Sequence, residues 1–295
     1  MTDVAFSEAE LAPPRPLRRL LRTNPLLAFA AGLVLLLVLV SALAPLIAPY
    51  PADAGNATHP LETFLPPSWH HVFGTDPVGR DLFSRVLYGT RISLTVAAAV
   101  IGFSIAVGLP LGVAAGAFGG LADTILMRVT DIFLAFPALL LSLALAAVLS
   151  PSVTNATIAI AVTWWPWYAR LARGTAASVA GRPFIAACRA LGLSPLRTIV
   201  RHVLPNSLTP VIVQASADVG GVILTSAALS FLGLGAQDPT PEWGLMVNQG
   251  QAYFPTQWWL VTFPGAAILL TALAFNLLGD GLRDVLDPRR VVGRT

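Results

Sequence analysis

Long apolar stretches recur along the chain and set its expected architecture. They cover residues 26–48, 92–122, 132–169, 206–233 and 258–279. A helix needs about 20 apolar residues to cross the hydrocarbon core of a bilayer. Residues 132–169 are long enough for two crossings, and a turn-like Ser-Pro-Ser-Val-Thr-Asn sequence interrupts them at 150–155. Because a helix satisfies its own backbone hydrogen bonds in lipid, the pattern predicts an all-α polytopic membrane protein with about six transmembrane helices.

The basic residues are all arginine, and they gather in alternate connections between these stretches. Only Arg80, Arg85 and Arg91 fall on the opposite side of the membrane from the other arginines. Cytoplasmic segments carry the excess of basic residues, so both termini are expected to be cytoplasmic. The expected organisation is a cytoplasmic tail at 1–24, a first span with an extracytoplasmic loop and interfacial segment at 25–91, a transmembrane core at 92–283 with a cytoplasmic loop at 170–205, and a cytoplasmic tail at 284–295.

The N-terminal region also has features of a cleaved signal peptide. A basic stretch precedes the first apolar run, and Ala42-Leu43-Ala44 resembles a cleavage site. Pro45 follows that site directly, and the run continues to Ala48, beyond the usual 7–15 residues of a signal peptide. An uncleaved first span is therefore the expected state.

Composition supports a membrane protein without catalytic chemistry of its own. The 295 residues are 55% hydrophobic and 11% charged, whereas soluble domains carry roughly 25% charged residues. The single cysteine, Cys188, excludes an internal disulfide framework and a multi-cysteine metal site. The adjacent pair His70 and His71 is interpreted as solvated loop residues, and no motif for a nucleophile, a phosphate-binding loop or a dinucleotide is present. No catalytic residue, bound cofactor or metal site is expected.

The cytoplasmic loop at 170–205 has the features of a docking element. It holds six arginines and no acidic residue, and it is too long for a simple connection. Gly192 separates two expected short helices, of which the second begins at Ser194-Pro195 and stops at Pro205. Their apolar stripe suits either the groove of a partner protein or an anionic lipid surface, and the residue pattern alone favours neither.

Residues 184–192 together with 201–206 resemble the EAA signature of ABC importer permeases. In that family the loop forms coupling helices that dock in a cleft of the ATPase subunit. Ala186 stands where the signature has glutamate, and Cys188 occupies its third position, so the resemblance leaves helix-in-groove packing without the ionic anchor. The residues that the resemblance implies as ATPase contacts are Phe184, Ala186, Ala187, Cys188, Ala190, Leu191, Gly192, Leu204 and Pro205.

Further stretches narrow the resemblance to the C-type permeases of dipeptide, oligopeptide and nickel importers. They lie at 74–94, 228–235 and 279–289. The resemblance implies a multi-pass protein of the bacterial inner membrane that forms half of a translocation pathway. It also implies a B-type permease, two ATPase subunits that hold ATP and magnesium, and an extracytoplasmic substrate-binding protein as partners, with lipid around the spans and no nucleic acid. Peptides, nickel chelates and glutathione are all solutes of this family.

Charged residues precede the second span on the extracytoplasmic side. Asp76, Arg80, Asp81 and Arg85 are expected just outside the membrane, and Asp81 and Arg85 have the spacing of an ion pair on a helix. A structural interfacial helix is the favoured interpretation. A role in docking of the binding protein or in gating is the alternative.

Asp218 is the only ionisable residue inside an expected span, and Gln214 lies one turn before it. Because such residues usually face a bundle interior or water, both are candidates for the wall of the translocation pathway. A buried structural hydrogen-bond network is the equally weighted alternative.

Small and aromatic residues give two packing predictions. Gly108, Gly112 and Gly116 lie on one helix face and predict close approach of a neighbouring helix. The aromatic residues expected at span ends are interpreted as interfacial anchors rather than as a ligand cage; they are Trp164, Trp165, Trp167, Tyr168, Trp258 and Trp259.

Two other classes of membrane protein fit the sequence less well. A secondary transporter predicts inverted repeats and several intramembrane ionisable groups, and an intramembrane enzyme predicts clustered His, Asp or Glu within the spans. The expected spans contain Asp218 alone and no clear repeat. The importer permease is therefore the leading hypothesis, and the ion-coupled transporter is its alternative.

Overall fold

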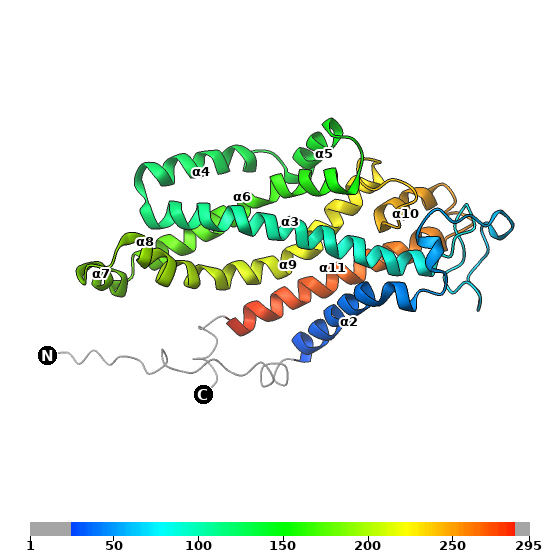
Figure 1. The fold of residues 1–295 in the computed structure, drawn as a ribbon, viewed down its shortest axis with the longest axis horizontal. Helices are drawn as coiled ribbons and strands as arrows, with labels where there is room; N and C mark the ends of the chain where they lie inside the picture. The colour runs from blue at the N-terminus through cyan, green and yellow to red at the C-terminus, as the bar shows by residue number, and fades with distance from the viewer. Residues whose placement is uncertain (1–24, 287–295) are drawn as a thin grey trace.

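The protein is an elongated bundle of helices, described here from a computed structural model that covers residues 25–286 (Figure 1). The tail expected at 1–24 and the end of the tail expected at 284–295 lie outside these residues. The long helices are α2 (Pro25–Ile47), α3 (Leu82–Phe118), α6 (Val153–Ala180), α9 (Leu204–Phe231) and α11 (Trp259–Leu286). The short ones are α4 (Gly120–Leu134), α5 (Ala138–Val148), α7 (Pro183–Ala190), α8 (Pro195–Thr198) and α10 (Trp243–Gln251), with single turns η2 (Pro51–Ala54), η3 (Pro60–Glu62) and η4 (Ile199–Val203).

Several of these helices can cross a membrane. Four are long and apolar enough, namely Pro25–Ile47, Leu82–Phe118, Pro195–Phe231 and Trp259–Val285. The pair α4 and α5, bent by 80° at its break, makes a fifth if it is one span. Helix α6, with 28 residues, is not among them. The all-α membrane architecture is confirmed, while six spans are not confirmed by this criterion.

The helix boundaries differ from the predicted ones because local capping and tertiary contacts override hydropathy. Helix α3 begins ten residues before the predicted start at 92, because Asp81 caps its first turn by accepting a hydrogen bond from the Ser84 amide at 2.7 Å. The predicted end of the second stretch at 122 is also wrong, because Gly119 and Gly120, with φ of 65° and 58°, end α3 at Phe118.

The third stretch is interrupted where predicted, since α5 ends at Val148 and α6 begins at Val153. Its predicted start at 132 is wrong, because α4 ends at Leu134 and a break at Pro137 precedes α5.

Helix α6 extends beyond the predicted end of its span at 169 to Ala180. Two ion pairs join its extension to α4, because Arg170 meets Asp131 at 2.5 Å and Arg173 meets Asp123 at 2.6 Å. Arg170 and Arg173 ended the apolar pattern in the sequence. In the structure they remain within α6, because each pairs with a carboxylate of α4.

The predicted glycine stripe is confirmed as the contact between α3 and α6. A Cβ atom built on Gly108, Gly112 or Gly116 would lie 2.6, 2.2 or 2.4 Å from a backbone oxygen of α6. Only a residue without a side chain allows the two backbones to approach this closely.

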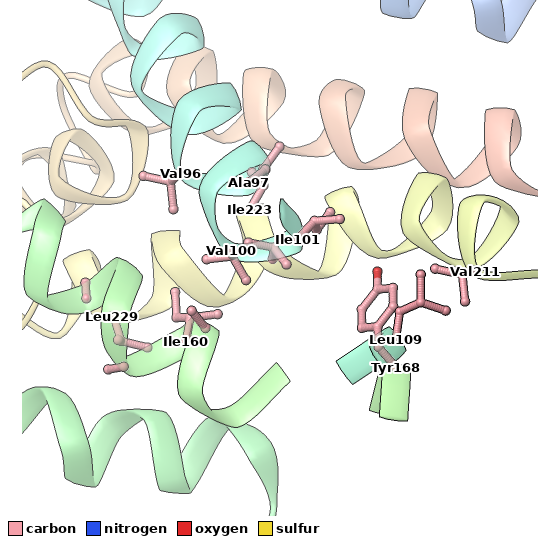
Figure 2. Packing of buried hydrophobic residues seen from close by; sticks show 14 of the residues in the cluster. Val96, Ala97, Val100, Ile101, Leu109, Ile160, Tyr168, Val211, Ile223 and Leu229 are labelled. Carbon is pink, nitrogen blue, oxygen red and sulfur yellow. The ribbon is translucent and has the colours of Figure 1, made fainter. Parts of the chain in front are cut away.

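The core of the bundle lies where α3, α6 and α9 meet. Figure 2 shows Val100, Ile160, Ile223 and Leu229 pointing toward one another from these helices, and each is at most 2% exposed.

The two ends of the bundle carry different structures. The loops at 48–81 and helix α10 gather at one end, and α7 and α8 project at the other (Figure 1). The start of α2 and the end of α11 both lie away from the end that carries α10 (Figure 1), in agreement with termini on one side of the membrane. Which side that is stays a prediction from the arginine distribution.

Candidate functional site: a coupling loop, a cavity and a buried ionic cluster

The loop at 170–205 contains two short helices joined at Gly192. Helix α7 ends at Ala190, and Gly192 adopts a φ of 80°, which reverses the chain direction before α8. The predicted end of the second helix at Pro205 is wrong. Helix α8 continues through the π-helical turn η4 into α9, so that Pro195–Phe231 forms one helix. The wider π turn just before Pro205 accommodates the missing N–H of that residue.

Apolar side chains of this loop are exposed at the end of the bundle. Phe184 is 41%, Leu191 80% and Leu196 69% exposed, whereas Ile185 and Val203 are buried and fix the loop to the bundle. Of the other predicted contact residues, Cys188 and Leu204 are half-buried, and Ala186, Ala187, Ala190, Gly192 and Pro205 are exposed. The loop thus presents an apolar surface of the kind that a partner groove covers.

A cavity of about 520 Å³ opens between α6 and α9. Its lining residues are Trp164, Trp167, Arg170, Leu171, Gln214 and Asp218. The structure therefore places both sequence-predicted pathway residues on one cavity wall, where the Gln214 Nε2 donates to Asp218 Oδ1 at 2.8 Å.

Aromatic residues around this cavity depart from the predicted interfacial role. Tyr168 is fully buried, so that its prediction as an anchor is wrong, and Trp164 and Trp167 line the cavity. Figure 2 shows the Tyr168 ring beside Leu109, with its hydroxyl pointing away from the helix that carries it. The cavity wall is therefore more aromatic than the hydropathy pattern indicated.

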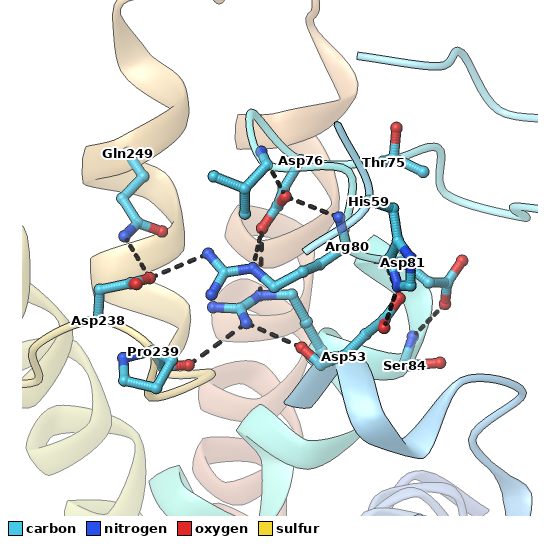
Figure 3. Close-up of polar contacts among 12 residues, drawn as sticks. Asp53, His59, Thr75, Asp76, Arg80, Asp81, Ser84, Asp238, Pro239 and Gln249 are labelled. Carbon is cyan, nitrogen blue, oxygen red and sulfur yellow. Dashed lines mark hydrogen bonds and ion pairs between the residues drawn. The ribbon is translucent and has the colours of Figure 1, made fainter. Parts of the chain in front are cut away.

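At the opposite end, the charged residues before α3 form a buried cluster (Figure 3). Arg80 donates from Nε to Asp76 at 2.6 Å and from Nη2 to Asp238 at 2.9 Å. Arg85 donates from Nη1 to the backbone oxygens of Asp53 at 3.0 Å and Pro239 at 3.3 Å. This cluster joins the loop at 48–81, the start of α3 and the connection between α9 and α10.

Two sequence-based predictions for this region are wrong. The charged residues themselves are buried among the loops, since Asp76, Arg80, Asp81 and Arg85 are each at most 5% exposed. The expected Asp81–Arg85 ion pair does not form, because Asp81 caps α3 and pairs with His71 at 2.9 Å. His71 is consequently buried, and only His70 of the adjacent pair is exposed.

Most polar groups of the cluster pair with one another, although Arg85 Nη2 is buried without a hydrogen-bond partner in the described part of the chain and Asp238 is 56% exposed. The pKa of Glu242 is raised by burial while its carboxylate caps α10 through the Leu245 amide. Burial opposes ionisation of Asp238, yet the hydrogen bonds from Arg80 and Gln249 lower its pKa. The hydrogen bond to Asp53 raises the pKa of His59. Buried charges that are paired and hydrogen-bonded in this way fix loop geometry and disfavour direct contact with a docking partner.

Asp53, Asp238 and Glu242 were missed by sequence reasoning. Asp53 and Asp238 lie in loops far from Arg80 in the chain. Asp238, which pairs with Arg80, is 158 residues away from it. The cluster of proline and acidic residues at 238–242 is the one local signal that could have drawn attention to this loop.

An Asp76→Asn substitution is expected to destabilise this end of the protein by about 3 kcal/mol, because Asp76 pairs with the buried Arg80 at 2.6 Å and with the buried Arg85 at 3.7 Å. Thermal unfolding in detergent measures the effect. Glu62→Gln is the matched control, since Glu62 lies in the same loop but is 48% exposed. Equal unfolding temperatures for the two variants would contradict a structural role for the cluster.

Comparisons with known proteins point in one direction. Residues 108–292 match the family described as "Binding-protein-dependent transport system inner membrane component", and residues 17–67 match "N-terminal TM domain of oligopeptide transport permease C". The chain is 48% identical to the probable D,D-dipeptide transport system permease protein DdpC of Escherichia coli strain K12, over 92% of this chain and 90% of that relative. It is 42% identical to the glutathione transport system permease protein GsiD of Pectobacterium atrosepticum, over 92% of this chain and 89% of that relative.

A solved structure shares the fold at low sequence identity. A chain from the structure described as "Inward facing conformations of the MetNI methionine ABC transporter" aligns with a TM-score of 0.55 and 18% identity. The alignment covers 70% of this chain and 98% of the other.

Proposed function

Because the chain belongs to the family of binding-protein-dependent transport system inner membrane components, we propose that it forms half of the translocation pathway for peptides or similar small solutes. Its place as a multi-pass permease subunit of a bacterial inner-membrane ABC importer follows from that membership. ATP hydrolysis in such importers belongs to separate ATPase subunits. Membership of this family gives no support to the alternative of an ion-coupled transporter.

Peptides are the solute class that the relatives support best. The relatives named above are described as permease proteins of a probable D,D-dipeptide transport system and of a glutathione transport system. Another relative, from Alkalihalophilus pseudofirmus, is described as a dipeptide transport system permease protein and has 42% identity over 95% of this chain and 91% of that relative. Nickel is a solute of the wider permease family, but none of the relatives described above is named for nickel transport. A small peptide is accordingly the proposed solute.

The family implies a permease partner, an ATPase and a substrate-binding protein. The finer composition proposed for this complex is one B-type permease, two ATPase subunits that hold ATP and magnesium, and one extracytoplasmic binding protein. ATP binding would bring the ATPase subunits together and move the coupling loop, and the permease pair would then open outward to receive solute. Hydrolysis would reset the pair.

The single observation that carries the coupling role is the α7–Gly192–α8 element. It is fixed to the bundle by buried Ile185 and Val203, and it exposes Leu191 and Leu196 at the end opposite the ionic cluster. Exposed apolar side chains on a short helix are the anchors of helix-in-groove recognition. Phe184 and the small residues of α7 would pack in the ATPase cleft.

The ionic cluster is proposed to act indirectly. Buried Asp76, Arg80, Asp81 and Arg85 would hold the loop at 48–81 in shape for the binding protein. The side chains that this loop exposes include Leu61 at 98% and Trp69 at 100%. Docking would then involve these exposed residues rather than the charges.

Site-directed crosslinking tests the assignment of the two ends. In a Cys188→Ser background the chain has no other cysteine, so a Leu191→Cys variant is expected to crosslink to the ATPase subunit within the assembled complex. A Leu61→Cys variant is its matched control, because Leu61 is equally accessible at the other end of the bundle. Crosslinking of the ATPase to position 61 rather than 191 would reverse the proposed polarity.

A further inference from the structure

The cavity between α6 and α9 carries one charged group of each sign. Asp218 of α9 and Arg170 of α6 both line it, and Trp164 and Trp167 add aromatic surface. Its volume of about 520 Å³ lies within the roughly 300–1,000 Å³ of typical small-molecule sites. The lining therefore suits a small solute that carries both a positive and a negative charge.

Asp218 is supported as the negative pole of this site by its neighbours. Gln214 donates a hydrogen bond to one of its oxygens at 2.8 Å. The fully buried Tyr168 hydroxyl makes no hydrogen bond of ordinary geometry among the described residues. It nevertheless lies close enough to Asp218 to interact electrostatically with the carboxylate. An ionisable residue within a span is costly unless it faces water or a ligand, and these neighbours leave Asp218 capacity to accept a further donor.

Arg170 forms the positive pole at the edge of the cavity. Its side chain is 51% exposed, and one nitrogen, Nη2, pairs with Asp131 at 2.5 Å. A guanidinium group has five N–H donors in a fixed fork. The remaining donors stay available for a carboxylate that enters the cavity.

The two poles lie on neighbouring helices that approach each other at the cavity. A Cβ atom on Gly221 of α9 would lie 3.5 Å from the ring of Trp164 on α6, and Trp164 lines the cavity together with Asp218 and Arg170. A peptide in the cavity is therefore bordered by both charged groups.

We propose that this cavity binds a zwitterionic small peptide. The ammonium group of the peptide would contact Asp218 beside the faces of Trp164 and Trp167, where cation–π attraction adds to the ion pair, and its carboxylate would contact Arg170. The inference rests on the proposed function and deepens it, because it makes this chain a selector of peptide termini in addition to being a conduit.

Equilibrium binding to the purified permease–ATPase complex, without the binding protein, tests the inference directly. The probes are dialanine, N-acetyl-dialanine and dialanine amide. The unaltered complex is expected to bind dialanine at least about tenfold more tightly than either blocked peptide, since each blocked terminus removes one ion pair. An Asp218→Asn variant is expected to lose the discrimination against the acetylated peptide, and Arg170→Gln the discrimination against the amide.

Two further variants separate selection from folding. Asp218→Glu keeps the charge and is expected to keep the discrimination. Asp123→Asn removes the ion pair of Arg173 one turn along α6, outside the cavity lining, and is expected to behave as the unaltered chain. Failure of the unaltered complex to bind dialanine, or equal discrimination by the Asp218→Asn variant, would overturn the inference.

ATP-driven uptake by the complete complex provides the independent readout of the proposed function. If uptake of peptides requires ATP while the Asp218→Asn variant still discriminates between free and acetylated dialanine, only the zwitterion site is wrong. If the complex shows no ATP-dependent uptake, the proposed function itself is wrong.

Discussion

A Gly112→Leu variant is expected to fail to assemble the helical bundle. A Cβ at this position would lie 2.2 Å from the backbone oxygen of Ala169 and 2.8 Å from the Cβ of Ala172. These are atoms of the α6 backbone and its first side-chain carbon, so they cannot rotate away. Relief requires the two helices to separate, which costs more than the 1–3 kcal/mol of ordinary overpacking.

Gly102→Leu is the matched control for this prediction. It lies on the same helix, but a Cβ there would meet no atom within 4 Å. Size-exclusion chromatography of detergent-solubilised protein is expected to give a monodisperse peak for Gly102→Leu and aggregate or no protein for Gly112→Leu. A monodisperse peak for both would show that the α3–α6 contact does not determine the fold.

A Gly192→Asp variant is expected to assemble but to lose at least about tenfold in ATP-driven uptake. A side chain at this position would meet no atom within 4 Å, so the bundle itself is not disturbed. The φ of 80° is unfavourable for a residue with a Cβ atom, by about 1–2 kcal/mol, and the added charge lies within the exposed apolar surface. The loss would therefore arise where the loop meets its partner.

Gly233→Asp separates backbone strain from docking. Gly233 has a φ of 81° and equally open surroundings, but it follows α9 at the end that carries α10. The strain is therefore matched while the location is opposite. Uptake reduced equally in the two variants would mean that backbone strain, rather than a disturbed coupling loop, limits transport.

Features that depend on local spacing were predictable from the sequence. The stripe of Gly108, Gly112 and Gly116 identified a close helix contact, because one helix face is fixed by residue spacing alone. A lone Asp218 in an apolar stretch indicated either a cavity wall or a buried hydrogen-bond network, since an intramembrane charge needs a polar surrounding. The structure places it on the lining of the α6–α9 cavity.

Features that depend on distant partners were not predictable. Arg80 was expected just outside the membrane without a distant partner, whereas Asp238 pairs with it from another loop. The predicted span ended at Arg170 because a charged residue lowers the hydropathy of the stretch. In the structure Asp131 of α4 pairs with Arg170, and α6 continues beyond it. Ion pairs with residues distant in the chain thus allow an arginine to be buried or to lie within a helix where its residue type alone predicts exposure or a helix end.

The central claim is that this chain passes solute only as part of an ATP-driven complex. Proteoliposomes that contain this chain, its permease partner and the ATPase subunits, with binding protein outside and ATP inside, measure it directly with a pool of isotopically labelled dipeptides. Accumulation is predicted to require ATP, the binding protein and this chain together. Accumulation that persists without ATP, or that follows an imposed ion gradient, would contradict the account.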